Sequence, residues 1–245
     1  TQSSGSTAVT EGGNTDSYTV ELSTQPTSDV SVVLGVGGQL SVSPSNLIFT
    51  SLNWNVAQTV TVTATNDAVV EGLHSASISH STSSSDPNYS AIAVAGITVD
   101  ITDNDSAEVN FAPASVSMSE ASSPLAFTVT LSNPVASGVT LSVNSNFGTA
   151  LAGDFAPIVN GTLSFTANST AAQTVNVVLT NDALDENDES FGLTLSNLIA
   201  TGNVTLGAAS AEGSILDDDA TPTLTISSPS QPEGNSGSTT MNFTV

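Results

Sequence analysis

Acidic residues in the second half of the chain stand in short groups before, between and after segments rich in β-forming residues. The groups are Glu120, G-D-F at 153–155, N-D-A-L-D-E-N-D-E at 181–189 and D-D-D at 217–219. Because loops at one end of a β-sandwich converge, these distant segments can form one oxygen-rich pocket. Ca²⁺ takes six to eight oxygen ligands in flexible geometry, so it suits such a pocket better than Mg²⁺ or a transition metal. The carboxylates concerned are Glu120, Asp154, Asp182, Glu186, Glu189, Asp217, Asp218 and Asp219.

The charge of the whole chain favours the same interpretation. The 245 residues include 23 Asp and Glu but no Lys or Arg, which gives a formal net charge of -23. Clustered carboxylates repel one another, and here only cations from solution can relieve the repulsion. A chain this negative is not expected to bind nucleic acid or an anionic membrane through charge. The absence of Cys excludes disulfides and Cys-based metal sites.

The elements that must position the carboxylates are β-strands. Apolar and polar residues alternate in Q-T-V-T-V-T-A (58–64), L-A-F-T-V-T-L (125–131) and Q-T-V-N-V-V-L (173–179). Such period-two patterns, rich in β-branched residues, predict half-buried strands. No apolar run reaches the roughly twenty residues of a membrane-spanning helix, so no direct membrane insertion is expected. We predict an all-β chain of short strands packed as a sandwich.

The acidic motifs recur along the chain, which predicts tandem repeats. The recurring elements are Glu11, Glu120 and Glu233, the N-D pairs at 66–67 and 181–182, and the runs at 103–105 and 217–219. Corresponding elements stand about 110 to 115 residues apart, the length of one small domain. We therefore expect a repeat at 1–105, a second at 106–219 and the start of a third at 220–245. We expect the repeats to form an extended array.

The second repeat resembles the Calx-β domain, a family known from ion exchangers, integrins and bacterial surface proteins. The resemblance rests, in chain order, on Glu120, G-T-A-L-A-G-D-F (148–155), G-T-L-S-F (161–165), N-D-A-L-D-E-N-D-E-S-F (181–191) and D-D-D (217–219). It covers essentially all of 106–219 and implies an immunoglobulin-like sandwich of about seven strands. It also implies Ca²⁺ ligands at Glu120, Asp154, Asn181 or Asp182, Glu186, Glu189 and Asp217–Asp219.

The first repeat keeps only part of this pattern, so we expect it to bind fewer calcium ions or to bind them more weakly. It has no G-T-A-x-A-G-x-D segment, and His74 stands where Glu189 stands in the second repeat. We interpret His74 as a histidine of a turn or a strand surface. Its candidate calcium ligands are Glu11, Asp67, Glu71, Asp103 and Asp105.

Asp and Asn at strand ends often serve only as turn formers, which is the competing interpretation of these motifs. Most of the 23 acidic residues fall on the motif positions, however, and acids that merely face solvent would not concentrate in this way. The sequence contains no G-x-S-x-G nucleophile motif, and only 4% of its residues are aromatic, few for the sugar platforms of a glycosidase. We therefore predict a protein that is not an enzyme.

The expected function is structural. Calcium at the repeat junctions would stiffen the array and make it a stalk or spacer of a large secreted or cell-surface protein. The alternative is a subunit of a self-assembling extracellular filament, sheath or surface layer. The expected partners are calcium ions and neighbouring repeats or copies of the chain itself.

Overall fold

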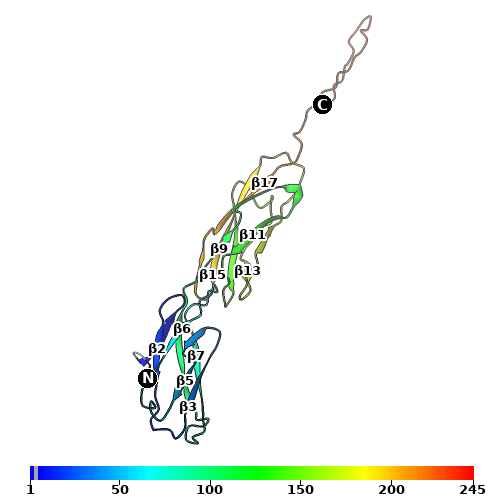
Figure 1. Ribbon diagram of the computed structural model, residues 1–245. Coiled ribbons are helices and arrows are strands. Elements are labelled where there is room, and N and C mark those ends of the chain that lie inside the picture. Colours follow the sequence, from blue (N-terminus) through cyan, green and yellow to red (C-terminus); the bar gives the residue numbers. More distant parts are fainter. Residues whose placement is uncertain (3–4) are drawn as a thin grey trace.

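In the computed structural model, which describes residues 1–2 and 5–245, two β-sandwiches follow one another along the chain (Figure 1). The all-β class predicted from the sequence is confirmed. Strands β1–β8 form the first sandwich and β9–β17 form the second, and the chain passes from one to the other between Thr102 and Ser106. No helix in the described part of the chain is long and apolar enough to cross a membrane.

The first sandwich packs a five-stranded sheet on a three-stranded sheet. In spatial order, the larger sheet consists of β1 (Thr7–Thr10), β8 (Val94–Thr102), β7 (His74–Ser84), β3 (Val30–Val36) and β5 (Asn46–Phe49). The smaller consists of β2 (Asp16–Val20), β6 (Gln58–Ala64) and β4 (Leu40–Ser43). Along β6, Val60 and Val62 point inward between exposed threonines. They pack with Tyr18, Phe49 and Ile78 in one core.

The second sandwich packs a five-stranded sheet on a four-stranded sheet. The larger consists of β10 (Ser115–Ser119), β17 (Ser210–Leu216), β15 (Glu189–Ile199), β12 (Val139–Phe147) and β13 (Gly161–Phe165). The smaller consists of β14 (Gln173–Val177), β11 (Leu125–Leu131), β9 (Ser106–Phe111) and β16 (Asn203–Leu206). The rings of Phe155 and Phe191 stack with centroids 4.5 Å apart in the core between the sheets.

The two larger sheets share a strand order that decides where the candidate site residues lie. In each of the two larger sheets the first and last strands in chain order run parallel, as β1 with β8 and β10 with β17. Their neighbours, β7 and β15, run antiparallel to them. The ends of two strands and the beginning of a third therefore meet at one edge of each sheet. Ser119 pairs with Leu216 at this edge in the second sandwich, and Glu189 pairs with Ile215.

The two sandwiches touch through the loop that joins β6 to β7. Val70 of this loop is completely buried and belongs to the hydrophobic core of the second sandwich. Its N–H donates to the Pro134 carbonyl at 2.8 Å, and its own carbonyl accepts from the Ala136 N–H at 2.9 Å. Gly72 lies so close to Gly202 that a Cβ on Gly72 would be 3.0 Å from the Gly202 Cα. The two sandwiches thus lie end to end (Figure 1). Val70 packs in the core of the second sandwich and forms a parallel β-bridge with Val135.

Residues 220–245, expected to begin a third repeat, lie outside both sandwiches (Figure 1). The segment folds back on itself, and the Ser227 N–H donates to the Thr244 carbonyl at 2.9 Å. Leu224, Ile226 and Phe243 are exposed. Glu233 is also exposed and belongs to none of the carboxylate clusters found in the described residues. The assignment of a third repeat stays a prediction.

Candidate metal centres

A group of carboxylates occupies the edge of the second sandwich where β10 and β17 end and β15 begins. Glu120 stands in a short 3₁₀ turn, η2 (Glu120–Ser122), directly after β10, while Asp218 and Asp219 follow β17. One carboxylate oxygen from each of these three residues lies within 4.8 Å of the others. The Glu120 side chain is only 7% exposed, and the Ser119 hydroxyl donates to Asp218. The parallel pairing of β10 with β17 therefore joins residues about 100 positions apart.

A recess beside this group collects further carboxylates that the sequence suggested. Its lining includes Glu120, Asp154, Glu186, Glu189 and Asp217. Asp154 reaches the recess from the β12–β13 connection, where its carboxylate accepts the Leu151 N–H at 2.6 Å. Four separate segments of the second sandwich thus supply oxygen atoms to one end of the fold.

The N-D motif at 181–182 both stabilises its own loop and lies near the carboxylate cluster. Asp182 accepts the Leu184 N–H at 2.8 Å, which closes an Asx-turn. The charge of Asp182 also raises the pKa of Glu120, so Asp182 lies near the cluster. The Asn181 amide donates to the Asp182 carbonyl at 3.2 Å. Asp182 is therefore better placed than Asn181 as a ligand, although either assignment stays a prediction.

Burial and mutual repulsion raise the pKa values of several of these carboxyls. The pKa of Glu120 is raised by burial and then by the charges of Asp182, Asp219 and Asp218. Burial raises the pKa of Glu189 to about 7, and a proton shared with Asp154 and the charge of Glu186 add to the rise. The pKa of Glu186 is also raised, by burial and by nearby acids. Without a cation, this end of the sandwich favours protonated carboxyls.

The raised pKa of Glu189 predicts that calcium binding depends on pH. A carboxyl must lose its proton to become a ligand, so protons compete with calcium below the pKa. With a pKa of about 7, we expect the apparent calcium affinity of the second sandwich to fall about tenfold from pH 8 to pH 6. Calorimetric calcium titrations of the intact chain at the two pH values measure this, and the Glu189→Gln variant should show a smaller change. Equal affinity at both values would contradict a ligand role for Glu189.

The first sandwich builds a similar cluster at the corresponding edge. Glu11 follows β1 and is 1% exposed. Its carboxylate takes part in two sets of close groups, one with Asp67 and Asp105 and the other with Glu71 and His74. The pKa of Glu11 is raised by burial and by the charges of Asp103, Asp67 and Glu71. Burial, then Asp103 and Asp67, raise the pKa of Asp105.

Asp103, a candidate ligand from the sequence, holds the loops of this cluster together. One of its carboxylate oxygens accepts the N–H groups of Glu71 at 2.9 Å and Gly72 at 2.8 Å. The other accepts the Asp105 N–H at 2.8 Å. These three hydrogen bonds attach the loop that contains Glu71 to the residues directly after β8. Since Asp103 belongs to neither close set, positioning of the loop is the role that its hydrogen bonds support.

The two clusters account for all the buried side-chain polar atoms in the described residues that have no hydrogen-bond partner. In the first sandwich these atoms are both carboxylate oxygens of Glu11, one of Glu71, one of Asp105 and Nε2 of His74. In the second they are one oxygen each of Glu120, Asp217 and Asp219. Buried polar atoms in folded proteins are nearly always hydrogen-bonded, and each exception calls for an explanation such as a bound ion.

Two residues that the sequence analysis did not select as candidate ligands lie in or beside the clusters. His74 was expected on a turn or strand surface, but it begins β7 with its imidazole in the Glu11 and Glu71 set. The signal was its alignment with Glu189. Asp188 accepts the Asp217 N–H at 3.2 Å and so orients the closing acidic run; nothing in its own residue type separated it from the other acids of 181–189.

A larger recess lies elsewhere, and its chemistry differs from that of the clusters. It has a volume of about 390 Å³, lies between β2 and β8, and is lined by Tyr18, His80 and Glu21. The Tyr18 hydroxyl and His80 Nε2 are hydrogen-bonded at 3.0 Å. Glu21 is the one carboxylate in its lining, so the acidic edges, and not this recess, define the candidate metal centres.

The fold and the acidic edge together define a β-sandwich of a calcium-binding class. Residues 102–219 match the model of the Calx-beta domain. The family is one of calcium-binding β-sandwiches, which supports the resemblance seen in the sequence motifs.

Solved structures give two further comparisons. The apo-form Calx CBD1 domain is 27% identical over 46% of this chain and 98% of its own, with a TM-score of 0.42. CBD12 from CALX1.2 is 15% identical over 87% of this chain and 98% of its own, with a TM-score of 0.41. No curated protein matches the chain.

Proposed function

We propose that this chain is a non-enzymatic, calcium-binding structural segment whose acidic sandwich ends bind Ca²⁺. The observation that supports this best is the confinement of the unpartnered buried polar atoms to the two acidic edges. Carboxylate oxygens without donors are suited to a hard divalent cation, and the chain has no Lys or Arg to neutralise them. The proposed calcium ligands are Glu11, Asp67 and Asp105 in the first sandwich, and Glu120, Asp154, Asp182, Glu186, Glu189, Asp217, Asp218 and Asp219 in the second.

In this proposal calcium acts on the junctions between sandwiches. The loop at 66–72 contains the proposed calcium ligand Asp67 and, three residues later, Val70, which packs in the second sandwich. A cation that fixes Asp67 therefore also restricts the loop that joins the two sandwiches. At the far edge, Asp217–Asp219 stand directly before the segment 220–245, so the same effect would apply where the chain leaves the second sandwich.

A stiffened series of sandwiches suits a stalk or spacer in an extracellular or cell-surface protein. The lack of Lys and Arg leaves no cleavage site for trypsin-like proteases, which would be an advantage outside the cell. The alternative is a subunit of a self-assembling filament. The exposed apolar side chains of Leu224, Ile226 and Phe243 favour contact with some further protein surface, and association of copies would be one form of it.

Small-angle scattering of the intact chain tests the stiffening. With excess calcium we expect an elongated particle of constant mass, because bound ions hold the loops at both acidic edges. With chelator the segment beyond Asp219 and the junction loop should gain freedom, and the profile should show greater flexibility. Identical profiles in the two conditions would refute the stiffening. A particle mass that rises with protein concentration would contradict the spacer function and favour the self-assembling filament.

A further inference from the structure

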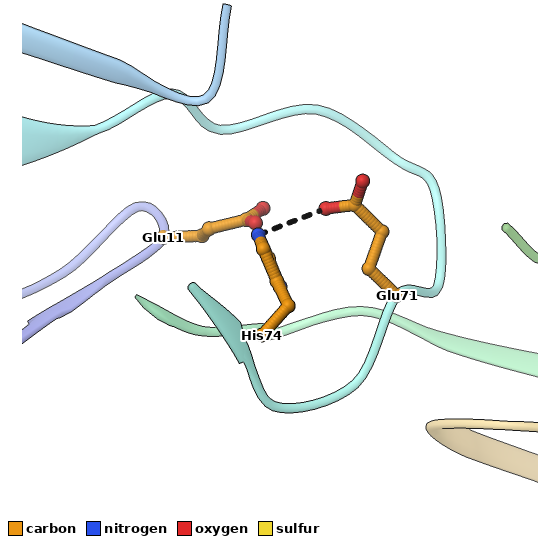
Figure 2. Close-up of side chains that lie close together, drawn as sticks. All are labelled: Glu11, Glu71 and His74. Atoms are coloured by element: carbon orange, nitrogen blue, oxygen red, sulfur yellow. Dashed lines mark ion pairs between the residues drawn. The ribbon is translucent and has the colours of Figure 1, made fainter. Parts of the chain in front are cut away.

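We propose that Glu11, Glu71 and His74 form a separate site for a divalent transition-metal ion such as Zn²⁺, beside the calcium ligands of the first sandwich. Figure 2 shows the three side chains pointing toward one another, Glu11 from the turn after β1, and Glu71 and His74 from the stretch of chain that leads into β7. One ligand atom from each lies within 4.8 Å of the other two. This donor set shares Glu11 with the calcium ligands proposed above, but Glu71 and the His74 imidazole belong to it alone.

The imidazole of His74 is held in the orientation of a metal ligand. Its Nδ1 lies 2.9 Å from the Gly72 carbonyl oxygen. Since a carbonyl only accepts, Nδ1 carries a hydrogen, and in the neutral ring Nε2 then keeps its lone pair. That Nε2 is buried without a hydrogen-bond partner. Histidines that bind metals characteristically donate their other ring N–H to a backbone carbonyl or a carboxylate in this way.

Glu11 and Glu71 each have a buried carboxylate oxygen that is free to bind a cation. Glu11 is 1% exposed, and neither of its oxygens has a hydrogen-bond partner. The Gln39 amide donates to Oε1 of Glu71 at 2.7 Å, which leaves Oε2 of Glu71 free to face His74. Nε2 of His74 and Oε2 of Glu71 are 3.4 Å apart, as the dashed line in Figure 2 marks. Two ligands bound at about 2.1 Å in a tetrahedron are about 3.4 Å apart.

The donor set decides the class of metal. Calcium is bound by oxygen atoms, whereas imidazole suits zinc and its transition-metal neighbours. Two carboxylates and one imidazole leave a tetrahedral ion one position open to water. In the second sandwich the position of His74 belongs to Glu189, which begins β15 as His74 begins β7. A single residue difference thus gives the two acidic edges different metal preferences.

The competing explanation is that a protonated His74 serves as an internal counter-charge for the two glutamates. The 3.4 Å contact between Nε2 and Oε2 would then be an ion pair. Zinc separates the two explanations, because a counter-charge role alone predicts no saturable zinc binding, whereas a ligand role predicts saturable binding that His74→Gln weakens.

The test is a calorimetric zinc titration of the intact, metal-free chain with excess calcium present, so that oxygen-only sites are filled. We expect one zinc ion per chain, with Nε2 of one of the two histidines shifting in the side-chain ¹⁵N spectrum. His74→Gln should weaken zinc binding more than about 100-fold. His80→Gln, which removes the other imidazole, should leave zinc affinity unchanged.

Folding of each variant is checked by its thermal midpoint with calcium and without zinc. A His74→Glu variant, which restores the residue type of the second sandwich, should lose zinc binding but retain calcium binding. Zinc affinity that is unaffected by His74→Gln, or an absence of saturable zinc binding to the wild-type chain, would overturn the proposal. Because calcium is titrated separately, failure of the zinc site is distinguishable from failure of the calcium sites.

Discussion

Substitution of Val70 by Asp is expected to separate the two sandwiches while leaving each one folded. Val70 is completely buried in the core of the second sandwich, although the chain places it in the first. A carboxylate there has no basic partner, and burying an unpaired charge costs several kcal/mol. We therefore expect Val70 to leave its pocket in the variant, and small-angle scattering in calcium should show two bodies that move independently.

An exposed valine gives the matched control. Val159 is 77% exposed in the second sandwich, so Val159→Asp adds the same charge without burying it and should leave the scattering profile unchanged. The calcium affinity of Val70→Asp should stay close to that of the wild-type chain, because Val70 offers no side-chain ligand. A rigid, elongated profile for Val70→Asp would mean that Val70 does not couple the sandwiches.

The Val70 contact also makes the acidic edges of the two sandwiches differ in how far their order depends on calcium. Asp185 stands in the second sandwich at the position that Val70 has in the first, and it is exposed. The first junction thus has an apolar contact that does not require calcium. At the far edge of the second sandwich the exposed Asp185 offers no such apolar contact, so the order of that edge should depend more strongly on a bound cation.

The sequence predicted the strands well because period-two alternation reflects burial directly. The segment 125–131 is β11, with Leu125, Phe127, Val129 and Leu131 pointing inward. The acidic motifs could be placed at strand ends for the same reason. The motifs come together because the first and last strands of each larger sheet pair in parallel, so β10 and β17 end at the same edge.

Other features could not be found from the sequence because they depend on tertiary contacts. Val70 looks like any apolar residue of a loop, and only the approach of Pro134 and Ala136 buries it. Asp103 looks like a ligand, but three backbone N–H groups occupy its oxygens. His74 could not be assigned to a metal site before the Gly72 carbonyl was seen to orient its ring.

Calcium is expected to raise the thermal midpoint of the second sandwich by on the order of 10 °C relative to the same chain in chelator. A ligand at about 100 times its Kd stabilises the folded state by about 2.7 kcal/mol. In a domain of about 100 residues, 1 kcal/mol shifts Tm by about 4–8 °C. The calcium-free protein is also destabilised by repulsion, because Glu120 has three acids near it and no basic group.

Two variants separate specific binding from general screening of charge. Glu120→Gln removes a carboxylate that is 7% exposed and central to the cluster, and it should abolish most of the calcium-dependent shift. Glu212→Gln removes an exposed carboxylate of β17 outside the clusters, and it should leave the shift intact. Equal loss in both variants would indicate charge screening and no defined site.

Calorimetric melting of the wild-type chain, first in calcium and then in chelator at constant ionic strength, tests the calcium proposal most directly. The account predicts a midpoint for the second sandwich that is higher in calcium by on the order of 10 °C and falls as calcium is withdrawn. A midpoint that is the same in calcium and in chelator would contradict it.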